Sequence, residues 1–118
     1  MKQYFLGSLL TLFLLMAQVW RTWPDQQAHL IFCDVGQGDA TLITSGSTQI
    51  LIDGGRHRQA ALACLAEHVP FWDRTLELMI ATHADADHIG GLPAVLEHYY
   101  VSQIITNSYS KETDIFEQ

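Results

Sequence analysis

Two histidines and two aspartates fall within six consecutive residues in the second half of the chain. The segment reads His83-Ala84-Asp85-Ala86-Asp87-His88 and runs on into Ile89-Gly90-Gly91. Imidazole nitrogen and carboxylate oxygen are the ligands that zinc and related divalent ions take in hydrolytic sites. An apolar run at 78–82 precedes the segment and predicts a buried strand that ends beside it. We predict a metal site here; the alternative is a solvated acidic loop with incidental histidines.

Two segments rich in glycine and aspartate precede this loop. They read Phe32-Cys33-Asp34-Val35-Gly36-Gln37-Gly38-Asp39-Ala40 and Ile50-Leu51-Ile52-Asp53-Gly54-Gly55. With the loop at 83–92, in this order, they resemble the metallo-hydrolase domain of ComEC-type competence proteins, which belongs to the metallo-β-lactamase superfamily. The resemblance runs from about residue 30 to the C-terminus. It implies an αββα sandwich of two similar halves, of which this chain supplies the first.

The resemblance also assigns roles to the acidic and histidine residues. His83 and Asp85 correspond to the first metal position, and Asp87 and His88 to the second. Asp85 stands where the superfamily pattern has a histidine, and a carboxylate there makes Mn²⁺ plausible beside Zn²⁺. Two ions are implied in the complete fold, where bound metal lowers the pKa of water toward ~7. We assign Asp87 a catalytic role as well, guiding the proton of that water.

Two further groups are implied to surround the metals. Asp53 corresponds to the carboxylate that orients a ligand histidine, the alternative being a turn residue before two glycines. The segment 34–39 is implied to lie at the edge of the site, through Asp34, Gly36, Gly38 and Asp39. We interpret both aspartates of that segment as structural, with contact between Asp39 and the metal as the alternative.

The ligand set is incomplete within this sequence. After His88 the only histidine is His98, which lies on a predicted helix. Each metal would then have about two protein ligands, below the three expected of a catalytic zinc site. We therefore interpret the chain as the N-terminal piece of a longer hydrolase, or as a truncated product that binds metal weakly.

The N-terminus is a separate element. Residues 5–20 carry no charge and would span roughly 24 Å as a helix. We predict a signal anchor at 1–23, a linker at 24–28 and a partial metallo-β-lactamase-like domain at 29–118. A cleaved signal peptide and a buried soluble helix are the alternatives. The positive-inside tendency places the domain outside the cytoplasm, on a single-pass membrane protein, or secreted if the N-terminus is cleaved.

Hydrophobic periodicity predicts an α/β (α+β) domain after that helix. Strands are expected at 28–35, 40–44, 48–53, 76–82 and 101–106, with helices at 57–69 and 93–99. Residues 109–118 are expected to form a loop that enters a further helix. Cys33 and Cys64 are interpreted as buried free thiols, with a disulfide as the alternative outside the cytoplasm.

Charge limits the possible partners. The 118 residues carry a formal net charge of −7 and no run of Lys or Arg. This composition argues against broad nonspecific binding of nucleic acid, but a metal pair would reverse the field locally, so a phosphodiester substrate is allowed. No obligate oligomer is inferred.

Three functions remain open on the sequence. The first is a membrane-anchored, metal-dependent hydrolase of phosphodiesters, with DNA uptake suggested by the resemblance and nucleic acid as a possible substrate. The second is an ester, thioester or lactam hydrolase with the same metal site. The third is a non-catalytic, membrane-tethered fragment that pairs with a polypeptide carrying the second half of the domain.

Overall fold

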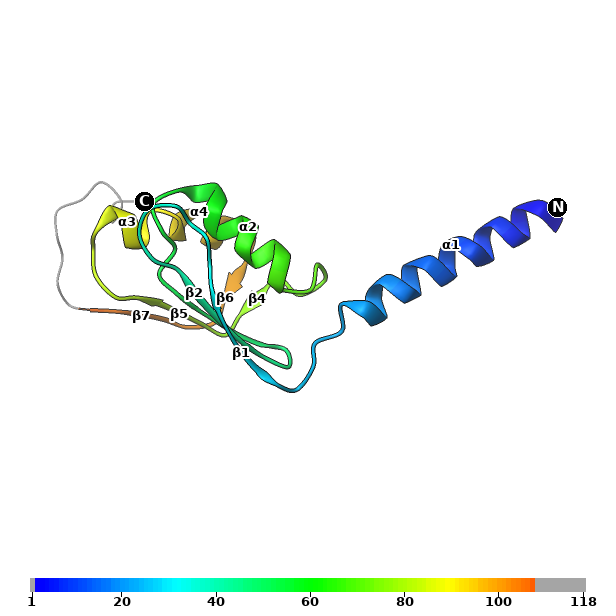
Figure 1. The fold of residues 1–118 in the computed structure, drawn as a ribbon, viewed down its shortest axis with the longest axis horizontal. Helices are drawn as coiled ribbons and strands as arrows, with labels where there is room; N and C mark the ends of the chain where they lie inside the picture. Colours follow the sequence, from blue (N-terminus) through cyan, green and yellow to red (C-terminus); the bar gives the residue numbers. More distant parts are fainter. Residues whose placement is uncertain (1, 108–118) are drawn as a thin grey trace.

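A long N-terminal helix stands away from a small α/β domain (Figure 1). The computed structural model describes residues 2–107, so the loop and helix expected at 109–118 lie outside the described residues. The chain measures 65 × 28 × 25 Å along its principal axes. Much of the longest dimension comes from α1, which runs from Lys2 to Arg21.

The length and exposure of α1 fit a membrane-crossing segment. Twenty residues make a helix about 30 Å long, the thickness of a hydrocarbon core. The window Tyr4–Arg21 has a mean hydropathy of 1.3, and none of it is buried against the domain. A signal sequence would have the same length and composition. Within the described residues, α1 exposes its large apolar side chains on all sides, which does not favour the alternative of a buried soluble helix.

A five-stranded mixed sheet forms the body of the domain, and it confirms the predicted mixture of helices and strands. Its strands are β1 (Ala28–Phe32), β2 (Thr41–Ser45), β3 (Thr48–Ile52), β5 (Leu78–Ala81) and β7 (Ile104–Thr106). The strand order is β1-β2-β3-β5-β7. The first three strands form an antiparallel meander, and β5 and β7 add to it in parallel. The C-terminal ends of β3, β5 and β7 therefore meet at one edge of the sheet.

Two predicted strands are each divided in the structure. The one expected at 76–82 becomes β4 (Thr75–Leu76) and β5, and the one at 101–106 becomes β6 (Tyr100–Val101) and β7. The β4 and β6 strands pair in a second, two-stranded sheet. The chain changes sheet at Glu77, whose carboxylate accepts a hydrogen bond from the backbone N–H of Gln49 at 2.7 Å. Periodicity along the chain does not reveal such a change of partner.

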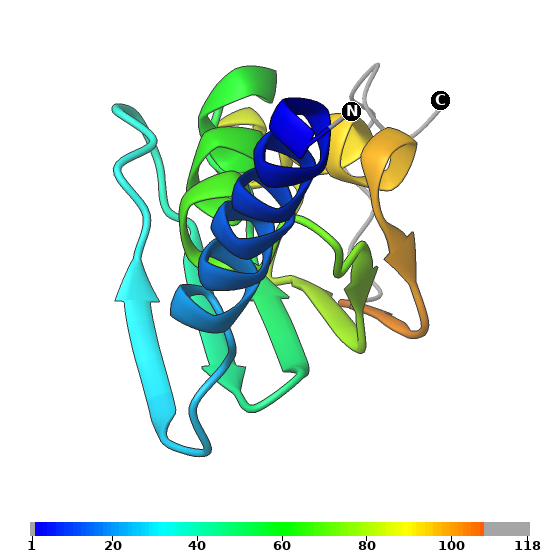
Figure 2. The same cartoon turned by 90° about the vertical axis from the view of Figure 1, so that its right-hand side faces the viewer.

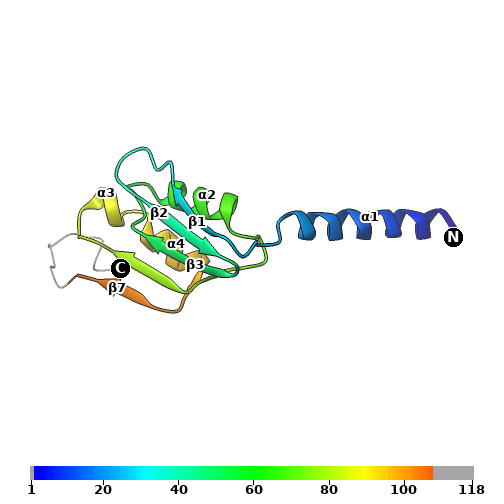
Figure 3. The same cartoon turned by 60° about the horizontal axis from the view of Figure 1, so that its bottom comes forward.

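Helices cover only one face of the sheet (Figures 2 and 3). These are α2 (Arg58–His68) and α4 (Leu92–His98), with the short α3 (Ala86–Ile89) before α4. The strand register places Ile31, Leu42, Leu51 and Met79 side by side on the covered face. Leu42 and Leu51 are fully buried there, in one cluster with Leu65 of α2 and Val95 of α4.

The opposite face of the sheet is apolar but uncovered by the described residues. The same register aligns Leu30, Ile43, Ile50 and Leu78 across that face. Leu30 is 60% exposed, and Phe32 in the next row is 77% exposed. Contiguous apolar surface of this kind marks a contact with another element or chain.

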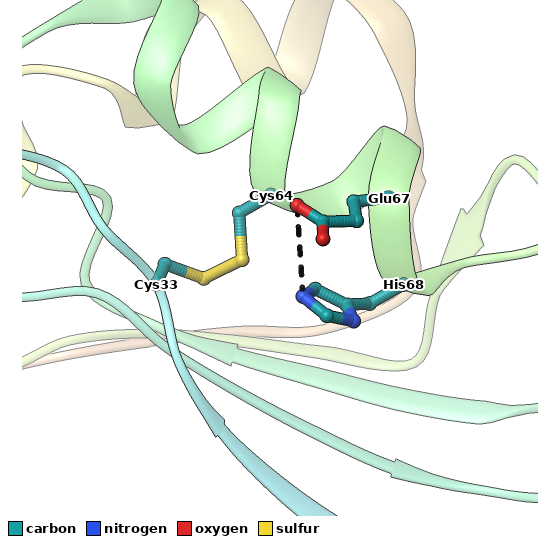
Figure 4. Close-up of a disulfide and its surroundings, with 4 residues drawn as sticks. All are labelled: Cys33, Cys64, Glu67 and His68. Atoms are coloured by element: carbon teal, nitrogen blue, oxygen red, sulfur yellow. Dashed lines mark ion pairs between the residues drawn. A yellow bond between two sulfur atoms is a disulfide. The ribbon is translucent and has the colours of Figure 1, made fainter.

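The interpretation of the cysteines as free thiols is wrong. Cys33 and Cys64 form a disulfide, with their Cα atoms 5.6 Å apart (Figure 4). Cys33 is also not in a strand: β1 ends one residue earlier, so Cys33 begins the loop that leads to Asp39. Residues 31 positions apart meet because α2 packs across the end of β1, which sequence spacing alone does not show.

The two faces of the sheet predict different responses to truncation. Leu51→Ala should lower the free energy of unfolding by roughly 2–5 kcal/mol, because it leaves a cavity in the core. The matched change Leu30→Ala, on the open face, should cost less than about 1 kcal/mol. Denaturant unfolding of both variants checks this; equal losses would mean that the open face is covered in solution.

The disulfide predicts a further stability difference. Opening it by Cys33→Ser and Cys64→Ser together should cost roughly 2–4 kcal/mol, since the bridge restricts the unfolded chain. Thermal unfolding of the double variant, beside the oxidised and the dithiothreitol-treated parent chain, provides the measurement. A parent chain that is insensitive to reduction would contradict the bridge.

Candidate metal centre

Three neighbouring strand ends bring the polar residues of the site together. Asp53 follows β3, Thr82 and His83 follow β5, and Asn107 follows β7. The Asp53 N–H donates to the carbonyl of Ile80 at 2.8 Å, which extends the β3–β5 pairing to the edge of the sheet. Open sheets with parallel strands commonly bind ligands beyond the carboxyl ends of those strands.

Asp53 is the buried hub of this edge. It is 4% exposed and holds a positive φ of 59°, a conformation that aspartate tolerates better than most residues. One carboxylate oxygen accepts the Thr82 N–H at 2.8 Å. The other accepts the Thr82 hydroxyl at 2.5 Å and lies 3.0 Å from Nδ1 of His88. These bonds compensate the cost of burying the charge.

The same hydrogen bonds determine which nitrogen of each imidazole carries the proton. Thr82 has a single hydroxyl proton and donates it to Asp53, so Nδ1 of His83, 2.9 Å from that hydroxyl, must be the donor to it. Nδ1 of His88 donates to the Asp53 carboxylate. In the neutral rings, both Nε2 atoms therefore keep a free lone pair, which is the form that binds metal.

A carboxylate stands beside each of these Nε2 atoms. An oxygen of Asp85 lies 3.4 Å from Nε2 of His83, and an oxygen of Asp39 lies 3.8 Å from Nε2 of His88. A lone pair facing a carboxylate is repulsive unless a proton or a metal cation lies between them. Ligands of a tetrahedral zinc ion are about 3.3–3.6 Å apart, which matches the closer pair. The two rings are themselves adjacent, with centroids 3.9 Å apart.

Asp53, His83 and His88 also form a compact set of possible ligands. One ligand atom from each lies within 4.8 Å of the others. Both oxygens of Asp53 already accept hydrogen bonds from protein groups. We therefore favour Asp53 as the residue that orients His88, as the resemblance implies, over Asp53 as a direct ligand. The donor set of imidazole and carboxylate fits Zn²⁺ or Mn²⁺.

Asp87 does not join that compact set among the described residues. It lies half-buried in α3, and its backbone carbonyl oxygen packs against Gly38. A side chain at Gly38 would overlap that oxygen, and Gly38 has φ +89°, so only glycine lets the 34–39 loop lie directly on α3. The catalytic role of Asp87 stays a prediction.

The two aspartates of the edge loop behave differently. An Asp34 oxygen accepts the N–H of Gly36 at 3.3 Å, within the turn itself. The Asp39 side chain is 80% exposed and reaches toward His88. Asp34 thus makes a local structural contact. Asp39 lies at the mouth of the site, where its carboxylate could contact a metal, as the alternative interpretation has it.

Backbone hydrogen bonds join the three sequence motifs around the site. The Gly54 N–H donates to the carbonyl of His88 at 2.6 Å, and the Gly55 N–H donates to that of Asp39 at 2.9 Å. The Gly91 N–H donates to the carbonyl of Gly55 at 3.0 Å. The short helix α3, which the sequence analysis treated as loop, is held in place by these contacts.

Two residues of the site were missed by the sequence analysis. Thr82 contacts both Asp53 and His83, and Asn107 donates from its side-chain amide to the Thr82 carbonyl at 2.7 Å. The available signal was position, because both residues directly follow strands whose ends meet at Asp53. His98 is not part of the site: its Nδ1 lies 2.8 Å from the carbonyl of Ala94 in its own helix.

Comparisons with known proteins agree with the resemblance that the three motifs indicate. The family model of the metallo-beta-lactamase superfamily matches residues 33–113. Over 63 residues the chain is 43% identical to lactamase-like protein vrtG of Penicillium aethiopicum, covering 52% of this chain and 20% of that protein. Over 78 residues it is 38% identical to Recombination protein 2 of Haemophilus influenzae, covering 64% of this chain and 10% of that protein. The chain thus spans a small part of each relative.

Thr82 provides a test of the site that does not depend on activity. Thr82→Val keeps the shape of the side chain but removes the hydroxyl that positions Asp53 and His83. Zn²⁺ affinity should fall roughly 10-fold or more, as for other groups that orient metal ligands. Thr48→Val, at the exposed start of β3, is the matched control. Competition titration of the full chain against a zinc chelator measures both; equal affinities would contradict the role of Thr82.

Proposed function

Because the chain belongs to the metallo-β-lactamase superfamily, we propose that it is a membrane-anchored, metal-dependent hydrolase of phosphodiesters. The observation that carries this proposal is the pair of imidazoles, each with Nδ1 bound to protein and Nε2 facing a carboxylate. In the neutral rings, this arrangement leaves a lone pair on each Nε2 that is available to a cation.

His83, Asp85 and His88 would hold the metal, with Asp39 as a further carboxylate at the mouth. Bound Zn²⁺ or Mn²⁺ would supply a hydroxide nucleophile at neutral pH and stabilise negative charge on the leaving oxygen. Asp53 and Thr82 keep both rings in the metal-binding tautomer. Asp87, in α3, is proposed to accept the proton of the attacking water from its place next to the 34–39 loop.

The phosphodiester assignment rests on similarity and on ligand chemistry. Recombination protein 2 is one of the relatives, which favours a nucleic acid and a competence-type role over a small metabolite. A carboxylate at Asp85 makes the first position harder than an all-histidine site and better suited to ions that bind phosphate oxygens. The sequence has no run of Lys or Arg, which supports recognition of the substrate at the metal rather than on a basic surface.

Two features support a location outside the cytoplasm. α1 is long and apolar enough to cross a membrane. The Cys33–Cys64 disulfide is of a kind that persists in oxidising compartments and is rare in the cytosol. Together they favour an anchored domain that faces the periplasm or the cell exterior, as the positive-inside tendency also suggests.

The open face of the sheet supports the idea that another part of the fold completes the metal site. The apolar row through Leu30, Ile43, Ile50 and Leu78 is what a second sheet would pack against. We propose that the second half of the domain, in a longer chain or a partner, covers this row and adds the remaining ligands. A purely non-catalytic, pairing role for this polypeptide is the corresponding alternative.

A second enzymatic candidate follows from the other relative. Lactamase-like protein vrtG shares more identity with this chain over a shorter region. Hydrolysis of an ester, thioester or lactam would use the same metal site, since the fold alone does not select the substrate.

Hydrolysis assays on the full chain in detergent micelles, loaded with Zn²⁺ or Mn²⁺, separate these functions. We expect slow turnover of bis(p-nitrophenyl) phosphate, since this chain supplies only part of the ligand set. The rate should fall roughly 100-fold or more in His88→Ala and Asp87→Asn, because each removes a group placed in the reaction. Asp34→Asn is the matched control and should leave the rate unchanged.

The other substrates decide between the alternatives. Turnover of nitrocefin or p-nitrophenyl acetate, without phosphodiester turnover, would favour the second candidate. Stoichiometric metal binding without turnover of any of the three substrates would contradict the enzyme proposal for this polypeptide and favour the pairing role.

A further inference from the structure

Aromatic side chains from two distant segments gather where α1 joins the domain. Trp20 and Trp23 come from the end of α1 and the linker, whereas Phe71 and Trp72 come from the loop between α2 and β4. The rings of Trp23 and Trp72 have centroids 6.1 Å apart, and those of Phe71 and Trp72 are 5.0 Å apart, edge to face. We call these four residues the aromatic collar.

The collar is exposed, which is unusual for side chains of this size. The exposed fractions are 84% for Trp20, 65% for Trp23, 66% for Phe71 and 40% for Trp72. They add nothing to the hydrophobic core, whose members all lie elsewhere. Tryptophan is enriched at membrane–water interfaces, where the apolar ring enters the lipid and the indole N–H meets the headgroups.

The loop that carries Phe71 and Trp72 is held rigidly. The Asp73 N–H donates to the carbonyl of Pro70 at 2.9 Å, and Asp73 accepts from the backbone N–H of Thr75 at 3.1 Å. Asp73 also accepts from the side-chain amide of Gln49, which is only 1% exposed. The two aromatic rings are therefore presented outward by a fixed turn anchored in the sheet.

The linker on the other side is fixed as well. The carbonyl of Asp25 accepts the N–H of Gly46 at 3.0 Å, and its carboxylate lies 2.8 Å from Nε2 of His29. The hydrogen bond with His29 lowers the pKa of Asp25 below its usual value. These contacts hold the linker next to the β2–β3 turn, four residues after the end of α1.

The collar and the metal centre lie at opposite ends of the domain. Figures 1 and 3 show α3, which carries Asp87 and His88, at the end away from α1. The loop after α2 lies at the end that faces α1 (Figure 1). A surface that contacts the collar would leave the metal centre open to the solvent on the far side.

We propose that the aromatic collar docks the domain on the surface of the lipid bilayer that α1 enters. The lipid surface is favoured as the occupant because the collar is continuous with the candidate membrane helix, whose last turn contains Trp20. This proposal rests on the membrane anchoring proposed above. Docking holds the domain upright, with the metal centre directed away from the bilayer toward substrate in solution.

Tryptophan fluorescence of the full chain tests this contact, since the chain contains three tryptophans. The chain is reconstituted in phosphatidylcholine vesicles whose acyl chains are brominated near the headgroup, and bromine quenches nearby indoles. In the variant Trp20→Phe with Trp23→Phe, the remaining Trp72 should lose roughly half its emission relative to unbrominated vesicles, as expected of an interfacial ring. The variant Trp23→Phe with Trp72→Phe reports on Trp20 and hence on the anchor.

Phe32 provides the matched control position. It is 77% exposed and lies at the end of β1 away from the linker. Phe32→Trp, combined with replacement of the three native tryptophans by Phe, should show no quenching by the brominated lipid.

Each other outcome overturns the proposal in a distinguishable way. Quenching of Trp20 without quenching of Trp72 would support membrane anchoring by α1 and contradict docking of the collar. Absence of quenching at both positions would contradict the anchoring and the docking proposals together. Equal quenching at the Phe32 position would show nonspecific adsorption. Protection of Trp72 from aqueous iodide without lipid quenching would assign the collar to a second copy or another protein.

Discussion

The buried carboxylate of Asp53 is the interaction on which the rest of the site depends. A charge with 4% exposure requires hydrogen-bond donors, and it obtains them from the backbone and hydroxyl of Thr82 and from the ring of His88. The parallel pairing of β3 with β5 supplies the first two, and the return of the chain through α3 supplies the third. His88 Nδ1 is bonded to Asp53 and His83 Nδ1 to the Thr82 hydroxyl, so both imidazoles turn Nε2 outward as candidate metal ligands.

The two ends of the domain's long axis carry different groups. The strand ends that bear polar residues lie at one extremity, whereas the linker, the β2–β3 turn and the aromatic collar lie at the other, beside α1. This arrangement follows from the parallel strands, whose carboxyl ends share one edge. The sheet is also one-sided: α2 and α4 bury one face, and the other exposes an apolar row. The candidate membrane helix, the candidate metal centre and the open face are therefore three separate surfaces with different chemistry.

Much of the secondary structure was predictable because it depends on local sequence patterns. The three motifs mark the strand ends and the tight loops, since glycine and aspartate are required where the backbone turns at positive φ. The length of the uncharged segment at 5–20 is by itself sufficient to predict the helix α1. The errors have a common origin in non-local contacts. The divided strands reflect changes of pairing partner at Glu77 and at residues 102–103, and the disulfide depends on α2 crossing the end of β1. Neither leaves a periodic trace along the chain.

The residue types and their order determined the family and predicted a metal site with the candidate ligands His83, Asp85, Asp87 and His88. The resemblance set Asp53 apart as the carboxylate that orients a histidine, and tertiary structure decided how each carboxylate is placed. Asp53 is buried against His88, Asp39 reaches toward it from the rim, and Asp34 closes its own turn. Tertiary structure also decided that Thr82 participates and that Trp72 meets Trp23. The reason is that charge burial and hydrogen bonding depend on distances between strands and helices, which spacing along the chain does not specify.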